Sequence, residues 1–150
     1  MKKNVSVFGK KNFDLWNKAM EAYEIFGTGE NIAYLDLKEK NYLAITKDPC
    51  MYDEDDVKNR RKIERSPKRY IPIPIVEASD DYELMEEFAF NSNDPQLIAA
   101  IQSDHPMSAF NTAICSSDKL RGDWLEFRET WRYEQLKKWA KKYGIDCPED

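Results

Sequence analysis

The segment Arg69–Val76, with the sequence RYIPIPIV, constrains the fold of this chain more than any other stretch. In an extended chain, side chains alternate between two faces, so its isoleucines share one face and its prolines the other. The prolines lack an N–H, and their two-residue spacing places the missing donors on the same hydrogen-bonding side. We therefore predict an edge strand, with the isoleucines inward and the prolines blocking a further strand. The alternative is a polyproline-type ligand for a partner domain.

Helical and extended patterns alternate before this segment. Apolar residues recur at three- and four-residue steps from Asn12 to Phe26, which predicts an amphipathic helix that Asn12 caps and Gly27 ends. Two extended runs follow it and predict a hairpin with a four-residue connection over 38–41. The predicted strands are Val5–Phe8, Ile32–Leu37 and Tyr42–Thr46.

The chain becomes helical after the proline segment. Asp80, with Glu83 three residues later, fits a capping box at the start of the next helix. Asp94 and His105 each precede a proline that opens a further helix, because proline is favoured at the first helical position. We therefore interpret His105 as a helix-entry residue. The predicted elements beyond residue 115 are a loop over Ser116–Gly122, a last helix over Asp123–Tyr143 and a stop at Gly144.

These elements predict an α+β fold: a small antiparallel sheet, edged by the isoleucine-proline strand and packed against N-terminal and C-terminal helices. With 150 residues, of which 41% are hydrophobic and 13% aromatic, the chain has the size and composition of a single domain over residues 1–150. We assign residues 47–68 to a charged loop, with a short charged helix as the alternative.

Charge is divided unevenly along the chain. The net charge of −5 argues against generic nucleic-acid binding. Seven basic residues face one glutamate from Lys58 to Arg69, and they are candidates for holding an anion. From Tyr70 to Asp118 there are nine carboxylates and no lysine or arginine. The carboxylates at 53–56 lack the spaced ligands of a calcium loop, so we predict no metal site there.

Catalytic and cofactor motifs are absent from the sequence. There is no GxGxxG, Walker, GxSxG or HExxH pattern, and we expect no cofactor. Asp36 and Lys38 resemble the acid-x-Lys end of a metal nuclease, which keeps a metal-dependent hydrolase or nuclease as a further alternative. Three widely spaced cysteines favour a reducing cytoplasm. No apolar run is long enough to span a bilayer, and the basic N-terminal stretch lacks the apolar core of a signal peptide.

Four motifs follow one another in the second half of the chain. An Arg-Tyr…Ile-Pro strand at 69–74 precedes a Tyr-x-x-Met-x-x-Phe helix at 82–88, an Ala-Phe pair at 109–110 and a Trp-x-x-Phe-Arg helix at 124–128. In this order the motifs resemble the bacterial uncharacterised protein family 158. The resemblance covers about residues 69–145. It implies a compact α+β domain and supplies no established activity. Asn111 and Thr112 replace a basic pair that the family tends to have, so an anion site built on that pair does not carry over.

Two binding functions compete on this evidence. The first is a regulatory, inhibitory or phage-encoded module that is not an enzyme and docks on a protein through an acidic helical face. The second is a small-ligand binder with an arginine and aromatic pocket for a nucleotide-like anion, because arginine grips phosphate and aromatic rings stack on bases. The residues predicted to dock on the protein partner are Asp80, Asp81, Glu83, Glu86 and Glu87. The predicted pocket comprises Arg69, Tyr70, Trp124, Arg128 and Trp131.

Overall fold

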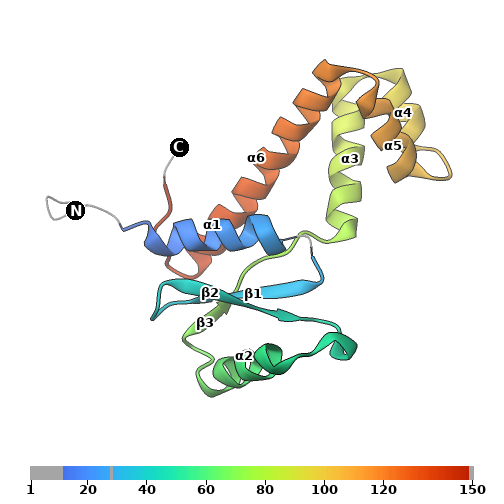
Figure 1. Cartoon of the computed structure of the whole chain (residues 1–150). Helices are drawn as coiled ribbons and strands as arrows, with labels where there is room; N and C mark the ends of the chain where they lie inside the picture. Colours follow the sequence, from blue (N-terminus) through green and yellow to red (C-terminus); the bar gives the residue numbers. More distant parts are fainter. Residues whose placement is uncertain (1–11, 28, 149–150) are drawn as a thin grey trace, which may run out of the picture. The chain divides into compact units, whose positions relative to one another are not determined.

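The computed structural model describes residues 12–27 and 29–148 of the chain (Figure 1). The predicted strand at Val5–Phe8 lies outside these residues. The described chain divides into two compact units, one made of the residues up to 75 and from 135 onward, the other of Val76–Glu134. Folding of residues 1–150 as a single domain stays a prediction.

The first unit contains a three-stranded antiparallel sheet with the order β2-β1-β3. The strands are β1 (Asn31–Asp36), β2 (Asn41–Thr46) and β3 (Tyr70–Pro72). The predicted hairpin is confirmed, with its connection at 37–40 in place of 38–41. Lys40 takes a left-handed conformation in this turn, with a φ of 53°. Together with the helices, the sheet confirms the α+β class.

The isoleucine-proline segment forms the edge strand that its spacing predicts, although the paired part is short. Ile71 and Ile73 are buried and Pro72 is exposed. The backbone N–H of Ile73 donates to the carbonyl of Ala33 on β1 at 2.8 Å. Because backbone groups alternate in direction along a strand, those of Pro72 point away from β1. The Pro72 carbonyl instead accepts a hydrogen bond from the Trp139 indole at 2.8 Å, which closes this edge.

Helix α1 (Asp14–Phe26) packs against β1 and β2. It begins one residue later than predicted: the capping position is held by Phe13 in place of Asn12, whose side chain accepts from the N–H of Asp14 at 2.8 Å. Gly27 ends the helix as predicted. The buried residues of the helix are Trp16, Ala19, Ala22 and Tyr23.

The segment predicted to be a charged loop contains a short 3-10 helix η1 (Pro49–Met51) and the α-helix α2 (Glu54–Arg65). The loop assignment is therefore wrong, and the charged-helix alternative is correct. The physical reason is a capping box: the N–H of Asp56 donates to the Asp53 carboxylate at 2.9 Å, and the Asp56 carboxylate accepts from the N–H of Asp53 at 3.2 Å. Figure 1 shows α1 and α2 on opposite sides of the sheet.

The second unit is helical. Its helices are α3 (Ala78–Ser92), α4 (Pro95–Ile101), α5 (Pro106–Cys115) and the first part of α6 (Asp118–Lys142). The proline-initiated helices α4 and α5 are confirmed, with His105 at the entry of α5. A core cluster includes Leu97, Phe110 and Trp124, and Phe110 is fully buried. No helix of the described residues is long and apolar enough to cross a membrane.

In the second unit, two helix starts differ from the sequence prediction. The reciprocal cap of α3 joins Glu77 and Asp80, one turn earlier than predicted, and Asp80 accepts from the N–H of Glu77 at 3.0 Å. Helix α6 begins at Asp118, so the predicted loop at 116–122 is wrong. An Arg121–Asp118 ion pair at 2.6 Å and a Lys119–Asp123 ion pair at 2.9 Å lie along this added turn. A glycine within a helix costs only about 1 kcal/mol, so such local contacts and packing are enough to continue it through Gly122.

Candidate functional site

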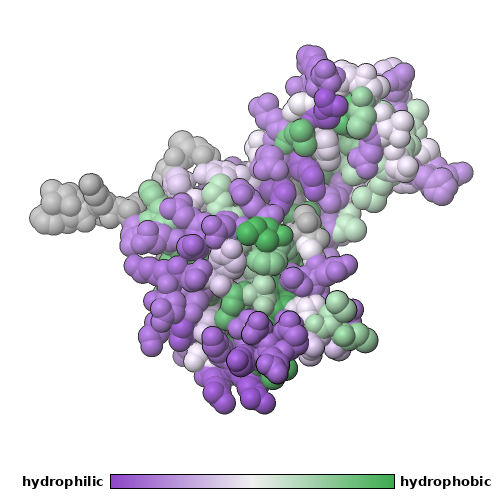
Figure 2. Space-filling view, viewed as in Figure 1, coloured by the Kyte–Doolittle hydropathy of each residue, from purple (hydrophilic) through white to green (hydrophobic). Residues whose placement is uncertain are grey.

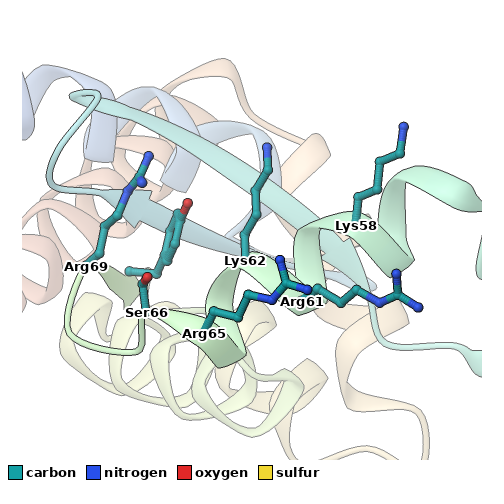
Figure 3. Close-up of a pocket in the computed structure, with 7 residues that line it drawn as sticks. Lys58, Arg61, Lys62, Arg65, Ser66 and Arg69 are labelled. Carbon is teal, nitrogen blue, oxygen red and sulfur yellow. The ribbon is translucent and has the colours of Figure 1, made fainter.

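A basic pocket of about 350 Å³ lies in the first unit (Figure 3). Its lining comes from α2, from the turn after it and from the start of β3. We call it the basic pocket, and its lining residues are Lys58, Arg61, Lys62, Arg65, Ser66, Arg69 and Tyr70. Five of these seven side chains are cations and none is a carboxylate. Figure 2 shows mainly hydrophilic residues over the region where α2 lies.

Four of the cations form a stripe along one face of α2. Lys58, Arg61, Lys62 and Arg65 have the i, i+3, i+4, i+7 spacing that brings side chains to one side of a helix. We call these four residues the cation stripe. The sequence builds it on a helix whose first turn is acidic and whose last turn is basic, which suits the helix dipole.

The cation stripe is available to a ligand. Its four members are exposed, and no carboxylate in the part of the chain that the structure describes lies within ion-pair distance of them. Like charges held on one helix face repel one another, so an anion between them relieves an unfavourable interaction as well as forming new contacts. Ammonium and guanidinium groups side by side are typical of phosphate binding.

Arg69, the fifth cation, is already paired. Its guanidinium donates from Nε to Oδ1 of Asp36 and from Nη2 to Oδ2, both at 2.7 Å. Asp36 is 7% exposed and also accepts from the backbone N–H groups of Lys38 and Glu39 at 3.0 and 3.1 Å. The hydrogen bonds from Arg69 are the main reason that the pKa of Asp36 lies below its ordinary value, and the two backbone donors add to them against the effect of burial.

The environment of Asp36 bears on the nuclease alternative. Four donors surround this carboxylate, three at Oδ1 and one at Oδ2, and through them it holds Arg69 and the hairpin turn in place. The described residues contain no group of three or more His, Cys, Asp or Glu side chains that could hold a metal ion. Asp36 thus has a structural role at the start of the hairpin turn, and the nuclease alternative stays a prediction.

The five predicted ligand residues fall in different units. Arg69 and Tyr70 line the basic pocket, and the Arg69 guanidinium lies 5.0 Å from the centre of the Tyr70 ring. Trp124, Arg128 and Trp131 belong to the second unit and line none of this pocket.

Trp124, Trp131 and Arg128 instead make structural contacts within the second unit. Trp124 is 6% exposed and packs against Phe110 with ring centres 5.0 Å apart, so its faces are not open to a base. Trp131 is half-buried against the same core. Arg128 lies 3.6 Å from the Asp81 carboxylate. The four members of the cation stripe belong to the basic run at 58–69 that the sequence offers for holding an anion, but the predicted pocket leaves them out. Their spacing marks one face once residues 54–65 are taken as a helix.

The predicted acidic surface divides into two groups. Asp80 caps α3 and Asp81 pairs with Arg128, so both have structural contacts. Glu83, Glu86 and Glu87 are exposed on α3. Phe90, which sequence reasoning did not select, follows at the same helical spacing and is 44% exposed. We call Glu83, Glu86, Glu87 and Phe90 the acidic face of α3.

The fold and the pocket define a class: an α+β protein with an exposed pocket lined by cations. A family model described as Uncharacterised protein family (UPF0158) matches residues 15–147, so the chain belongs to this family. The match confirms the resemblance and extends it from about residue 69 back to α1. No curated protein and no solved structure matches the chain.

Proposed function

We propose that the protein is a binding protein without catalytic activity, whose basic pocket holds a small anion with two or more phosphate groups. The supporting observation is the set of five cations around one pocket with no carboxylate among the lining residues. Asp36 neutralises Arg69, which leaves the four charges of the cation stripe. A phosphate monoester carries a charge of about −2, so one such group leaves half of the stripe unneutralised.

The lining indicates recognition of phosphate groups over recognition of a base. Among the lining residues, the one aromatic side chain is Tyr70, which is 4% exposed and covered on one side by Arg69. A nucleobase finds no open ring to stack on at such a site. The affinity should therefore follow the number of phosphates on a ligand and depend little on which base it carries.

Calorimetric titration tests this proposal. We expect sodium triphosphate, ATP and GTP to bind with affinities within a few fold of one another and AMP to bind far more weakly. A charge-assisted hydrogen bond contributes about 1.5–3 kcal/mol, so Arg61→Ala with Arg65→Ala should weaken triphosphate binding about 100-fold or more. Higher salt should also weaken it.

Lys138→Ala with Lys141→Ala is the matched control, since it removes the same charge from exposed positions of α6 in the first unit. It should change the affinity by less than about threefold, because charges far from the ligand are screened. The absence of binding heat for every phosphate, or an equal loss in both double variants, contradicts the proposal.

Docking on a protein through the acidic face of α3 is a second candidate function. The observation that favours it is Phe90, a large apolar side chain left 44% exposed beside three exposed carboxylates. An exposed aromatic residue with a charged rim is typical of a protein-binding surface. The fitting partner has an apolar pocket surrounded by lysine and arginine.

Affinity purification from the native host tests this second candidate. If the acidic face docks a partner, Phe90→Ala with Glu86→Lys should reduce its recovery about tenfold or more, because both the apolar anchor and the charge complementarity are lost. The matched control is Ile25→Ala with Glu24→Lys, which changes an exposed apolar residue and a neighbouring carboxylate on α1. Equal recovery with both double variants would count against docking through α3.

A further inference from the structure

Helix α2 is attached to the sheet through polar side chains. Asp56, Asn59, Arg60 and Ile63 are its partly buried residues, and they share the i, i+3, i+4, i+7 spacing of one face. None of the residues of α2 is fully buried. This face begins at residue 56 and the cation stripe at residue 58, and two residues turn an α-helix by about 200°. The cation stripe therefore lies on the opposite side of α2 and takes no part in this attachment. A helix of 12 residues with so little apolar contact is marginal without other support.

The polar face of α2 closes the outer edge of β2. The Asp56 carboxylate accepts from the N–H of Thr46 at 3.0 Å, and Arg60 donates to the Thr46 carbonyl. Asn59 donates to the carbonyl of Ala44 at 3.3 Å. The neighbouring N–H of Lys47 donates to Glu30, which precedes β1, at 3.0 Å, so Thr46 and Lys47 point in opposite directions. Three side chains of α2 thus occupy backbone groups that a further strand would use.

The strand β2 itself contains no residue that would prevent a further strand from pairing with its outer edge. Its sequence, NYLAIT, contains no charge and no proline, unlike β3 on the other edge, where Pro72 blocks pairing. Uncharged strands with exposed edges pair readily with copies of themselves, because nothing repels the second strand. Two β2 edges related by a twofold axis satisfy each other's backbone groups, and a twofold axis is the commonest symmetry in assemblies of identical chains.

We infer that α2 is a detachable cover, that the phosphate ligand of the basic pocket holds it closed, and that the uncovered β2 edge pairs with β2 of a second copy of this chain. The part of this inference in which the ligand holds α2 closed rests on the proposed function. A phosphate ligand that touches both the cation stripe and Arg69 joins α2 to the start of β3, and it therefore favours the closed state. Opening of α2 and strand pairing are tested without any ligand.

Amide hydrogen exchange measured by NMR on the full chain tests the cover. Without ligand, the Thr46 amide should exchange at least about tenfold faster than the Lys47 amide, since only the former is paired with α2. Saturating sodium triphosphate should slow Thr46 about tenfold or more and leave Lys47 nearly unchanged. If calorimetry shows binding and Thr46 does not respond, ligand control is wrong and the proposed function stands.

Sedimentation tests the pairing. Asn59→Ala with Arg60→Ala removes two of the three attachments and leaves the cation stripe intact, so it should convert monomer to dimer. Adding Thr46→Lys to this variant should restore the monomer, because a lysine on an edge strand opposes pairing with a second strand. The control Val57→Ala with Glu64→Ala alters exposed positions of α2 and should stay monomeric. A monomeric Asn59→Ala/Arg60→Ala variant with faster Thr46 exchange overturns the pairing, and unchanged exchange overturns the cover.

Discussion

Replacing Phe110 with alanine should lower the free energy of unfolding by about 3–5 kcal/mol, the cost of deleting a fully buried aromatic side chain. Phe110 is 0% exposed, and its ring centre lies 5.0 Å from that of Trp124 and 6.3 Å from that of Phe88. A cavity at this point removes contacts from two neighbouring rings at once. Urea unfolding followed by tryptophan fluorescence measures the effect.

Met107→Ala on the same helix is the control for this prediction. Met107 is 38% exposed, so its truncation should change the free energy of unfolding by about 0.5 kcal/mol or less. A loss below about 1 kcal/mol for Phe110→Ala would show that Phe110 does not anchor the helical core.

Asp36→Asn should lower the free energy of unfolding by about 2 kcal/mol at neutral pH. The amide keeps one oxygen acceptor, but its NH2 group faces the Arg69 guanidinium, so a donor meets a donor and the charge attraction is lost. The Arg69 side chain is 30% exposed, which places the effect toward the lower end for hydrogen bonds to charged groups. Thermal and urea unfolding both measure this loss.

The same ion pair predicts a direction of pH dependence. Because Arg69 holds the pKa of Asp36 below its ordinary value, the stabilisation is fully present above the pKa of an unfolded aspartate, about 3.9. It is lost as the pH falls through the lower pKa of the folded protein. The difference in stability between wild type and Asp36→Asn should therefore shrink in acid. A difference for Asp36→Asn that stays constant as the pH falls contradicts the linkage.

Local sequence patterns predicted most elements of this fold. The two-residue spacing of Pro72 and Pro74 was enough to place β3 at a sheet edge, because a missing N–H acts on the backbone directly. Proline at the helix starts was equally informative. The start of α6 was predicted wrongly because Gly122 was taken as part of a loop. The free-energy cost of one glycine inside a helix is small compared with the stabilisation from the contacts of a 25-residue helix. Such contacts do not appear in a local sequence pattern.

The candidate site was predicted only in part. Arg69 was selected from its place in a basic run, and it lines the pocket. Trp124 was selected as a surface for stacking, and it is a core residue. Aromatic residues at helical spacing fit both roles, and only burial distinguishes them. The basic run at 58–69 is a sequence candidate for holding an anion, but the predicted pocket leaves out its cation stripe, because the register of α2 decides which basic residues share a face.

The sequence by itself determined most of the secondary structure, the edge position of the proline strand, the division of charge and the family. These features depend on neighbours along the chain or on total composition. Only the tertiary structure decided that Asp36 pairs with Arg69, 33 residues away, and that α2 closes the edge of β2. It also decided that Trp124 lies in a core and the cation stripe faces solvent. Each depends on which distant segments meet, and that is set by the packing of the whole chain.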